Sequence, residues 1–244
     1  MVSRALFMGG ALLAFGLGAA AYAHDRAAHN EPAAATVWAE RTPEFDYDPP
    51  VPGTYELPEL RDAGDGAVLD IRGAPKRLRD ILRGKITLLS FIYTNCGDAK
   101  GCPLATAVLA DIFRAGSDQP DLAANLRLVT LSFDPGHDTP KVMAEYAAPL
   151  LALREGRPSC EWSFLTTAAE DDLDPILADY DQLVVKNLGR DNAFDGTFEH
   201  LLRVYLIDRA GRLRNIYGVS LLDPRLLVAD AKTLLLEERG VRPQ

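Results

Sequence analysis

Runs of apolar residues separated by short polar stretches rich in Gly and Pro dominate the chain from about residue 67 onward. The strongest run, Ile86–Tyr93, is apolar on both faces, as expected of a central strand that helices cover on each side. After Cys102 and Pro103, apolar residues recur at helical spacing, and proline suits the first position of a helix. A second apolar run, Leu126–Phe133, follows. The pattern therefore predicts a strand–helix–strand unit.

The remaining apolar runs are shorter and predict the other elements of one α/β domain. They indicate strands at Val68–Ile71, Trp162–Leu165, Leu201–Ile207 and Leu213–Tyr217, and helices at Leu78–Leu82, Lys141–Ala148, Asp174–Val185 and Leu221–Leu236. A turn at Asp208–Gly211 makes the last two strands a hairpin. This order of elements predicts a thioredoxin-like sandwich, in which helices flank a central mixed β-sheet.

The first 53 residues precede the predicted domain and consist of an uncharged run followed by a Pro-rich segment. Arg4 precedes an uncharged run, and the run ends in Ala21-Tyr22-Ala23. Residues 1–23 thus resemble a signal peptide with a small-residue cleavage site, and an N-terminal membrane anchor is the alternative. Both predict a periplasmic or other extracytoplasmic location. Residues 24–53 are predicted to be a flexible Pro-rich tether, and residues 54–240 the folded domain.

The composition argues against nucleic acid as a partner and against a fold that depends on disulfides. A net charge of −9 provides no basic surface for nucleic acid, and 48% hydrophobic with 25% charged residues is typical of a globular domain. Three cysteines are too few for a disulfide-stabilised scaffold of this length. In an oxidising compartment two closely spaced cysteines would pair and leave Cys160 as the odd one.

The main candidate for chemistry is the segment Cys96-Gly-Asp-Ala-Lys-Gly-Cys102-Pro103, between the buried strand and the helix start. The positive end of a helix favours a thiolate, the form that binds metal and attacks disulfides, and Lys100 adds to that field. Two glycines let the loop fold back so that the sulfurs can approach. Cys96 and Cys102 are therefore a candidate redox pair or part of a metal site. A structural disulfide is the alternative.

Two thiolates favour Cu(I) or zinc, and a neutral imidazole suits either metal as a third ligand. His24 and His29 lie in the predicted tether, where they are at best an accessory site, and His137 lies in the loop after the second strand. His200 opens a predicted strand of the same sheet as the strand that ends at Tyr93. That placement favours His200, although topology alone does not establish the contact.

The chain resembles the Sco/SenC family in an ordered set of motifs spanning about residues 54–238. These motifs are Gly84–Cys96, Cys102-Pro-Leu, Ser132–Pro140, Trp162–Thr166, and His200 followed by Val204–Asp208. The resemblance implies a thioredoxin-like fold and one copper ion bound by Cys96, Cys102 and His200. It further implies delivery of copper to, or preparation of, the CuA site of cytochrome c oxidase or another exported cuproprotein. It implies a supporting role for Asp134.

One departure from the family concerns the cysteine spacing: the usual motif has three residues between the cysteines, and this chain has five. The leading hypothesis is a copper metallochaperone with a copper ion as its cargo. The alternative is a thiol–disulfide oxidoreductase without obligatory metal, in which either Cys96 or Cys102 attacks the client. A peroxidase is a weaker third hypothesis, because no second marker of peroxide binding is present.

Overall fold

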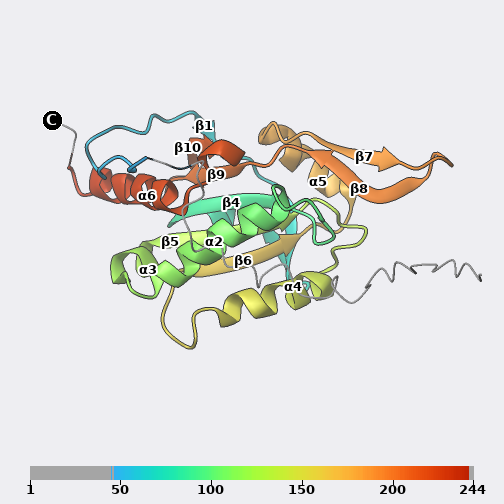
Figure 1. The fold of residues 1–244 in the computed structure, drawn as a ribbon, viewed down its shortest axis with the longest axis horizontal. Helices are drawn as coiled ribbons and strands as arrows, with labels where there is room; N and C mark the ends of the chain where they lie inside the picture. Colours follow the sequence, from blue (N-terminus) through green and yellow to red (C-terminus); the bar gives the residue numbers. More distant parts are fainter. Residues whose placement is uncertain (1–44, 46, 242–244) are drawn as a thin grey trace, which may run out of the picture. The chain divides into compact units, whose positions relative to one another are not determined.

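An eight-stranded mixed β-sheet lies at the centre of the computed structural model, which describes Phe45 and residues 47–241 (Figure 1). The strand order is β1-β10-β9-β4-β5-β6-β2-β3. The bounds are β1 Arg61–Asp62, β2 Ala67–Asp70, β3 Pro75–Arg77, β4 Ile86–Ile92, β5 Leu126–Ser132, β6 Glu161–Thr166, β9 Val204–Ile207 and β10 Arg212–Tyr217. β4, β5 and β6 are parallel neighbours, and the other pairs are antiparallel.

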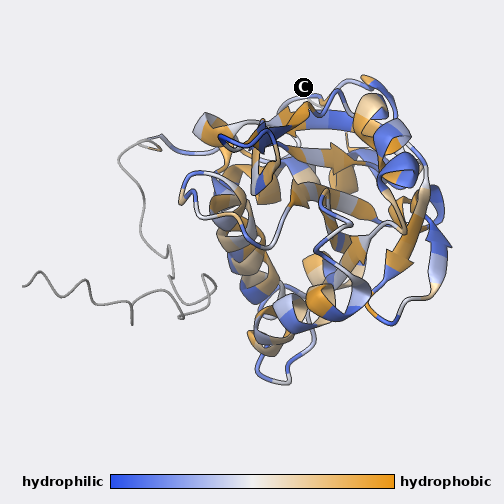
Figure 2. Ribbon diagram, turned by 90° about the vertical axis from the view of Figure 1, so that its right-hand side faces the viewer, coloured by the Kyte–Doolittle hydropathy of each residue, from blue (hydrophilic) through white to orange (hydrophobic). Residues whose placement is uncertain are grey.

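Six α-helices of the described residues accompany the sheet. They are α1 Leu78–Leu82, α2 Cys102–Gly116, α3 Pro120–Asn125, α4 Pro140–Ala152, α5 Glu170–Asp179 and α6 Pro224–Glu238. Every residue of β4 is buried, so protein covers both faces of this strand. Figure 2 shows hydrophobic residues concentrated on the central strands. The predicted strand–helix–strand unit and thioredoxin-like sandwich are therefore confirmed.

A separate two-stranded sheet, the hairpin of β7 Val184–Leu188 and β8 Phe194–His200, was not predicted. The prediction of a helix over Asp174–Val185 was wrong in its second half, because α5 ends at Asp179. Asp181 then adopts a left-handed φ of 48°, which reverses the chain. The β-branched residues that follow pair with β8 instead of continuing the helix.

The predicted strand that His200 would open also needs correction. His200 is the last residue of β8, where it pairs with Val184 in the hairpin, and the central sheet is entered only at Val204. Between His200 and Val204, the Gln182 side chain donates a hydrogen bond to the carbonyl of Leu201. His200 therefore approaches the site from outside the central sheet.

The segment before β1 has no strand from residue 47 to 60 and lies against α6. Arg225 donates hydrogen bonds to the carbonyls of Phe45 and Tyr47, and the Gly53 amide donates to Thr233. Residues 47–53, the end of the predicted tether, thus contact the domain. Residues 1–44, including the predicted signal peptide, His24 and His29, lie outside the described residues. Over Phe45 and 47–241, no helix has the length and apolarity required to cross a membrane.

Candidate thiol and metal site

The junction of β4 with α2 positions both motif cysteines. Cys102 is the first residue of α2, Pro103 is the second, and Gly101 is the N-cap residue. The predicted helix start is confirmed, with Pro103 at the second helical position and Cys102 at the first. The side chain of Cys102 is buried, whereas Cys96 in the preceding loop is half-buried. Of the two sulfurs, Cys96 is therefore the more accessible.

The loop between the cysteines closes on itself through Asp98. The carbonyl of Asp98 accepts from the Gly101 amide at 2.8 Å, and its Oδ1 accepts from the Lys100 amide at 3.0 Å. Neither Gly97 nor Gly101 has a positive φ, so the fold-back does not depend on that freedom of glycine. Gly101 matters by close approach, because a Cβ there would lie 3.2 Å from the Cys96 Sγ. Gly97 faces open space.

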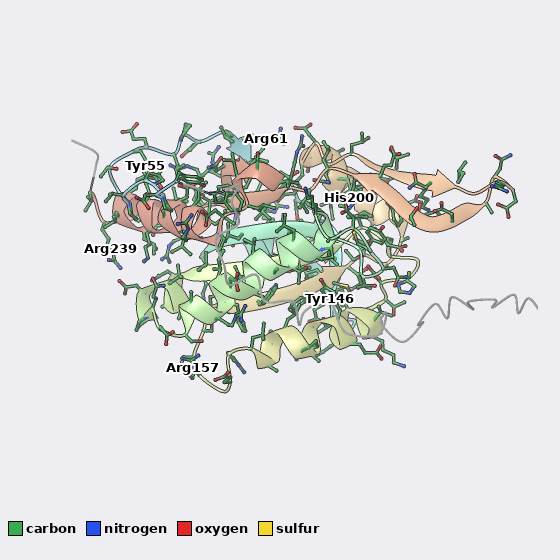
Figure 3. All side chains as sticks on the ribbon, viewed as in Figure 1. Tyr55, Arg61, Tyr146, Arg157, His200 and Arg239 are labelled. Atoms are coloured by element: carbon green, nitrogen blue, oxygen red, sulfur yellow. The ribbon has the colours of Figure 1, made fainter. Side chains whose placement is uncertain are left out.

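His200 reaches the cysteines from the base of the β7–β8 hairpin, where Figure 3 labels it. Its Nε2 lies 3.6 Å from the Cys102 Sγ. One ligand atom from each of Cys96, Cys102 and His200 lies within 4.8 Å of the other two. The three residues proposed from the sequence are thus brought together, although Cys102 and His200 are 98 positions apart.

Aromatic rings hold the imidazole in place. The His200 ring lies 4.9 Å from Phe133 and 6.0 Å from Tyr93, measured between ring centroids. Phe198, two residues earlier on the same face of β8, contacts both of these aromatic rings. The His200 Nδ1 is buried and has no hydrogen-bond partner among the described residues. The Nδ1 is thus enclosed, and the Nε2 is the ring nitrogen that faces the Cys102 sulfur.

The surroundings of the two thiols lower the pKa of Cys96 and raise the pKa of Cys102. A hydrogen bond from the Cys102 side chain lowers the pKa of Cys96 most, and His200 and the backbone amides of Cys102 and Asp98 lower it further, against the effect of burial. The hydrogen bond to Cys96 and burial raise the pKa of Cys102. Burial and then the charge of Cys96 raise the pKa of Tyr93 to about 12. The first thiolate therefore forms on Cys96.

A groove of about 790 Å³ opens onto Cys96 and His200. Phe198 and Ile216 contribute apolar surface to it, and it also includes polar residues of the cysteine loop. Leu201 and Val219 line it and are themselves exposed. The site is consequently accessible to another molecule from this side.

The other sequence candidates are not part of this group. His137 is half-exposed and bonds to Asn95 and Asp138. Cys160 is buried beside Ser159, and burial raises the pKa of its thiol to about 11, which makes it a poor nucleophile. All three cysteines are free thiols.

Sequence reasoning missed Asp138 and favoured Asp134 as the supporting carboxylate. Asp138 is fully buried and accepts hydrogen bonds from the backbone and side chain of Thr94, two residues before Cys96. The motif Ser132–Pro140 contains both aspartates, so residue type alone did not separate them. Phe198 was also missed, because its strand lies in the hairpin that was not predicted.

The donor set fits a soft metal ion. Cu(I) and zinc both accept a set of two sulfurs and one imidazole nitrogen, and the lowered pKa of one thiol supplies a thiolate ligand. The same arrangement also suits dithiol chemistry, because the sulfurs are free and close enough to pair. Fold and site together define a thioredoxin-like protein with a thiol–imidazole site.

Comparison with known proteins places the chain in a family. Residues 70–236 match the SCO1/SenC family model, and the chain belongs to this family. It is 27% identical over 157 residues to the SCO1 protein homolog of Bacillus subtilis (strain 168), covering 62% of this chain and 72% of that protein.

Solved structures have the same fold. ScoI of Bradyrhizobium japonicum, solved with copper bound, is 24% identical with a TM-score of 0.55, covering 70% of this chain and 98% of that one. BsSco, described as a member of the Sco family of cytochrome c oxidase assembly proteins in which a disulfide switch was identified, is 23% identical with a TM-score of 0.53. That match covers 74% of this chain and 98% of BsSco.

Proposed function

We propose that this chain is an exported copper metallochaperone in which Cys96, Cys102 and His200 hold one copper ion. The ion is delivered to, or used to prepare, the CuA site of cytochrome c oxidase or of another exported cuproprotein. The observation that carries the proposal is the approach of the three ligand atoms to within 4.8 Å of one another. Membership of the SCO1/SenC family and the copper bound to ScoI of Bradyrhizobium japonicum support it.

The chemistry of the site suits cargo that must be released. Thiolates and imidazole are the preferred ligands of Cu(I), and a three-ligand site leaves the ion open to attack by the ligands of an acceptor. Cys96 supplies a thiolate near neutral pH because its pKa is lowered. The groove beside Cys96 and His200 provides the side from which an acceptor approaches.

Export is the part of the proposal that rests on the sequence alone. The pattern of residues 1–23 supports either a cleaved signal peptide or an N-terminal anchor. N-terminal sequencing of the protein recovered from cells distinguishes these two forms.

Copper stoichiometry and affinity of the reduced full-length chain, measured anaerobically against a Cu(I) competitor, test the proposal. We expect one tightly bound copper in the wild type and its loss in Cys96→Ser, Cys102→Ser and His200→Ala. Cys160→Ser is the matched control and should bind as the wild type does, because Cys160 is not part of the group. Unchanged affinity in His200→Ala would overturn the three-ligand site.

A thiol–disulfide oxidoreductase is the second candidate function, and the lowered pKa of Cys96 favours it. The Cys96 thiolate attacks a client disulfide, forms a mixed disulfide and releases one client thiolate. Cys102 then attacks the Cys96 sulfur, forms the Cys96–Cys102 disulfide and releases the second client thiolate. The disulfide switch identified in BsSco is consistent with this chemistry. A wild type without tight copper that reduces a CuA-domain disulfide would make this the function.

A further inference from the structure

Asp138 lies at the centre of a buried hydrogen-bond network directly behind the cysteine loop. It precedes α4 and is fully buried. Its Oδ2 accepts from the Thr94 amide at 3.0 Å and from the Ser132 hydroxyl. Its Oδ1 accepts from the Thr94 hydroxyl and lies 2.9 Å from the His137 Nδ1. One carboxylate thus joins the chain after β4, the end of β5 and the start of α4.

The three site residues are positioned by three different parts of the fold. Cys102 is fixed by α2, and His200 is fixed by the hairpin and the aromatic rings around it. Cys96 belongs to neither element and lies in a loop. Its amide donates to the Tyr93 carbonyl at 3.3 Å, and Thr94 between them is bonded to Asp138 through both backbone and side chain. The position of Cys96 therefore depends on Asp138.

We propose that Asp138 is a positioning residue that holds Cys96 within ligand distance of Cys102 and His200. This inference rests on the proposed function insofar as the three residues bind one ion together. Asp138 acts through Thr94 and does not itself touch the ion or a client.

The network requires a carboxylate rather than an amide. Each oxygen of Asp138 faces two polar groups, and the Thr94 amide and the hydroxyls of Thr94 and Ser132 are donors. Asparagine would present an NH₂ group to one of these pairs. If the amide oxygen stays on the Thr94 amide, the NH₂ group faces the Thr94 hydroxyl, which must then accept instead of donating. The negative charge that strengthens each of these hydrogen bonds is also lost. In Asp138→Asn the chain around Thr94 is therefore expected to move, and Cys96 with it.

Asp134, the carboxylate that the family resemblance suggested, has no equivalent attachment. Within the described residues, the amide of Asp134 donates to the Ser132 hydroxyl, and its carbonyl accepts from the amides of His137 and Asp138. No hydrogen bond joins its side chain to Thr94. Its backbone shapes the loop that carries Asp138, and Asp138 makes the contact with the cysteine segment.

The experiment compares Asp138→Asn with a matched variant, Asp208→Asn, in the full-length chain. Asp208 is also buried and accepts from the amides of Ala210 and Arg212 and from Arg214. It lies at the opposite end of β4, because the neighbouring Arg209 carbonyl accepts from the Gly84 amide just before that strand. Both variants lose a buried carboxylate, and only Asp138→Asn loses it near Cys96.

Three quantities are measured for each variant: thermal stability, Cu(I) affinity, and the equilibrium of the Cys96–Cys102 pair with glutathione. In that equilibrium the dithiol and glutathione disulfide form the protein disulfide and two reduced glutathiones. For Asp138→Asn we expect a Cu(I) affinity about 10- to 100-fold lower, as for other residues that orient metal ligands. We also expect a shift of about tenfold or more toward the dithiol, because displacing Cys96 lowers the effective concentration of its sulfur at Cys102.

Asp208→Asn should lose stability and leave the Cu(I) affinity and the glutathione equilibrium unchanged. Equal losses of affinity in the two variants at equal stability would overturn the inference, since Asp138 would then be only structural. A folded Asp138→Asn with the wild-type affinity and equilibrium would also overturn it.

Thr94→Val keeps the experiment decisive if Asp138→Asn does not fold. This variant removes the Thr94 hydroxyl and leaves the Asp138 carboxylate in place. The expected loss in Cu(I) affinity is about 3- to 10-fold, the equivalent of one hydrogen bond, and an unchanged affinity and glutathione equilibrium would overturn the inference. A wild type that binds no copper would contradict the proposed function alone, because the glutathione equilibrium still tests Asp138.

Discussion

Cys96 and Cys102 are chemically identical residues that the structure makes different. The sequence predicts that the positive end of a helix favours a thiolate and leaves open whether Cys96 or Cys102 is the attacking cysteine. In the structure the Cys102 amide, at the start of the helix, donates to the sulfur of Cys96. Cys102 itself is buried and supplies a hydrogen bond to its partner. The helix terminus therefore activates the cysteine that precedes it.

A pH profile of alkylation tests this difference. Cys96 should react with iodoacetamide at a nearly constant rate from pH 8.5 down to about pH 6, whereas an ordinary thiol with a pKa of about 8.5 slows about tenfold per pH unit. Mass spectrometry of the labelled peptides assigns the rates. Cys160, whose pKa burial raises to about 11, is the unreactive control. A Cys96 rate that follows the ordinary thiol profile would contradict the lowered pKa.

The lowered pKa of Cys96 also makes the free energy of unfolding depend on pH. Because the folded pKa of Cys96 lies below the unfolded value, unfolding below that unfolded value takes up a proton. The stability that the Cys96 thiolate contributes is thus complete above about pH 8.5 and is lost as the pH falls through the folded pKa.

At the scale of elements, the β7–β8 hairpin determines where the third site residue lies. A row of aromatic rings follows one face of β8: Phe194 contacts Phe198, and Phe198 contacts Tyr93 and Phe133 beside the site. Phe198 is buried, whereas Phe194 is 40% exposed. The ring of Phe198 therefore attaches the hairpin to the domain next to His200.

Removing that ring should affect the site through His200. We expect Phe198→Ala to lower the Cu(I) affinity about tenfold or more. Without the Phe198 ring, the hairpin that carries the His200 imidazole is no longer attached to the domain beside the site. Phe194→Ala is the matched control on the same face, and its Cu(I) affinity should stay within about twofold of the wild type. Titration against a Cu(I) competitor measures both. Equal effects in the two variants would show that Phe198 does not position His200.

At the scale of the whole described structure, Arg214 joins three distant parts of the chain. Its buried guanidinium donates to the carbonyl of Leu57, to Asp208 in the turn between β9 and β10, and to Glu237 of α6. The segment before β1 is thereby attached to the side of the sheet that carries α6. Arg212, two residues earlier, pairs with Asp62 at the surface.

These two arginines should differ greatly in their contribution to stability. Arg214→Met leaves the buried Asp208 carboxylate without its cation and is expected to cost about 3–5 kcal/mol of unfolding free energy. Arg212→Met removes an exposed pair and should cost about 1 kcal/mol or less. Urea denaturation measures both. Cu(I) affinity should be unchanged in each, and similar losses of stability would contradict the role of Arg214.

The sequence by itself determined the local part of the site. Ile86–Tyr93 is a continuous apolar run, Pro103 suits a helix start, and both signals depend only on neighbouring residues. The structure accordingly contains β4, a loop with Cys96, and α2 beginning at Cys102. The predicted signal peptide lies in residues 1–44, outside the described part of the chain, and it stays a prediction, as do the boundaries of the tether and the domain.

Only the tertiary structure decided which distant residues reach that loop. His200 arrives from a separate hairpin, whose short strands alternate weakly between apolar and polar residues and so gave no clear pattern. Asp138 was indistinguishable from Asp134 until the burial of each and the hydrogen bonds to Thr94 were known. Local patterns specify elements, whereas the pairing of a loop with groups about 40 and 100 positions away depends on packing that no local pattern contains.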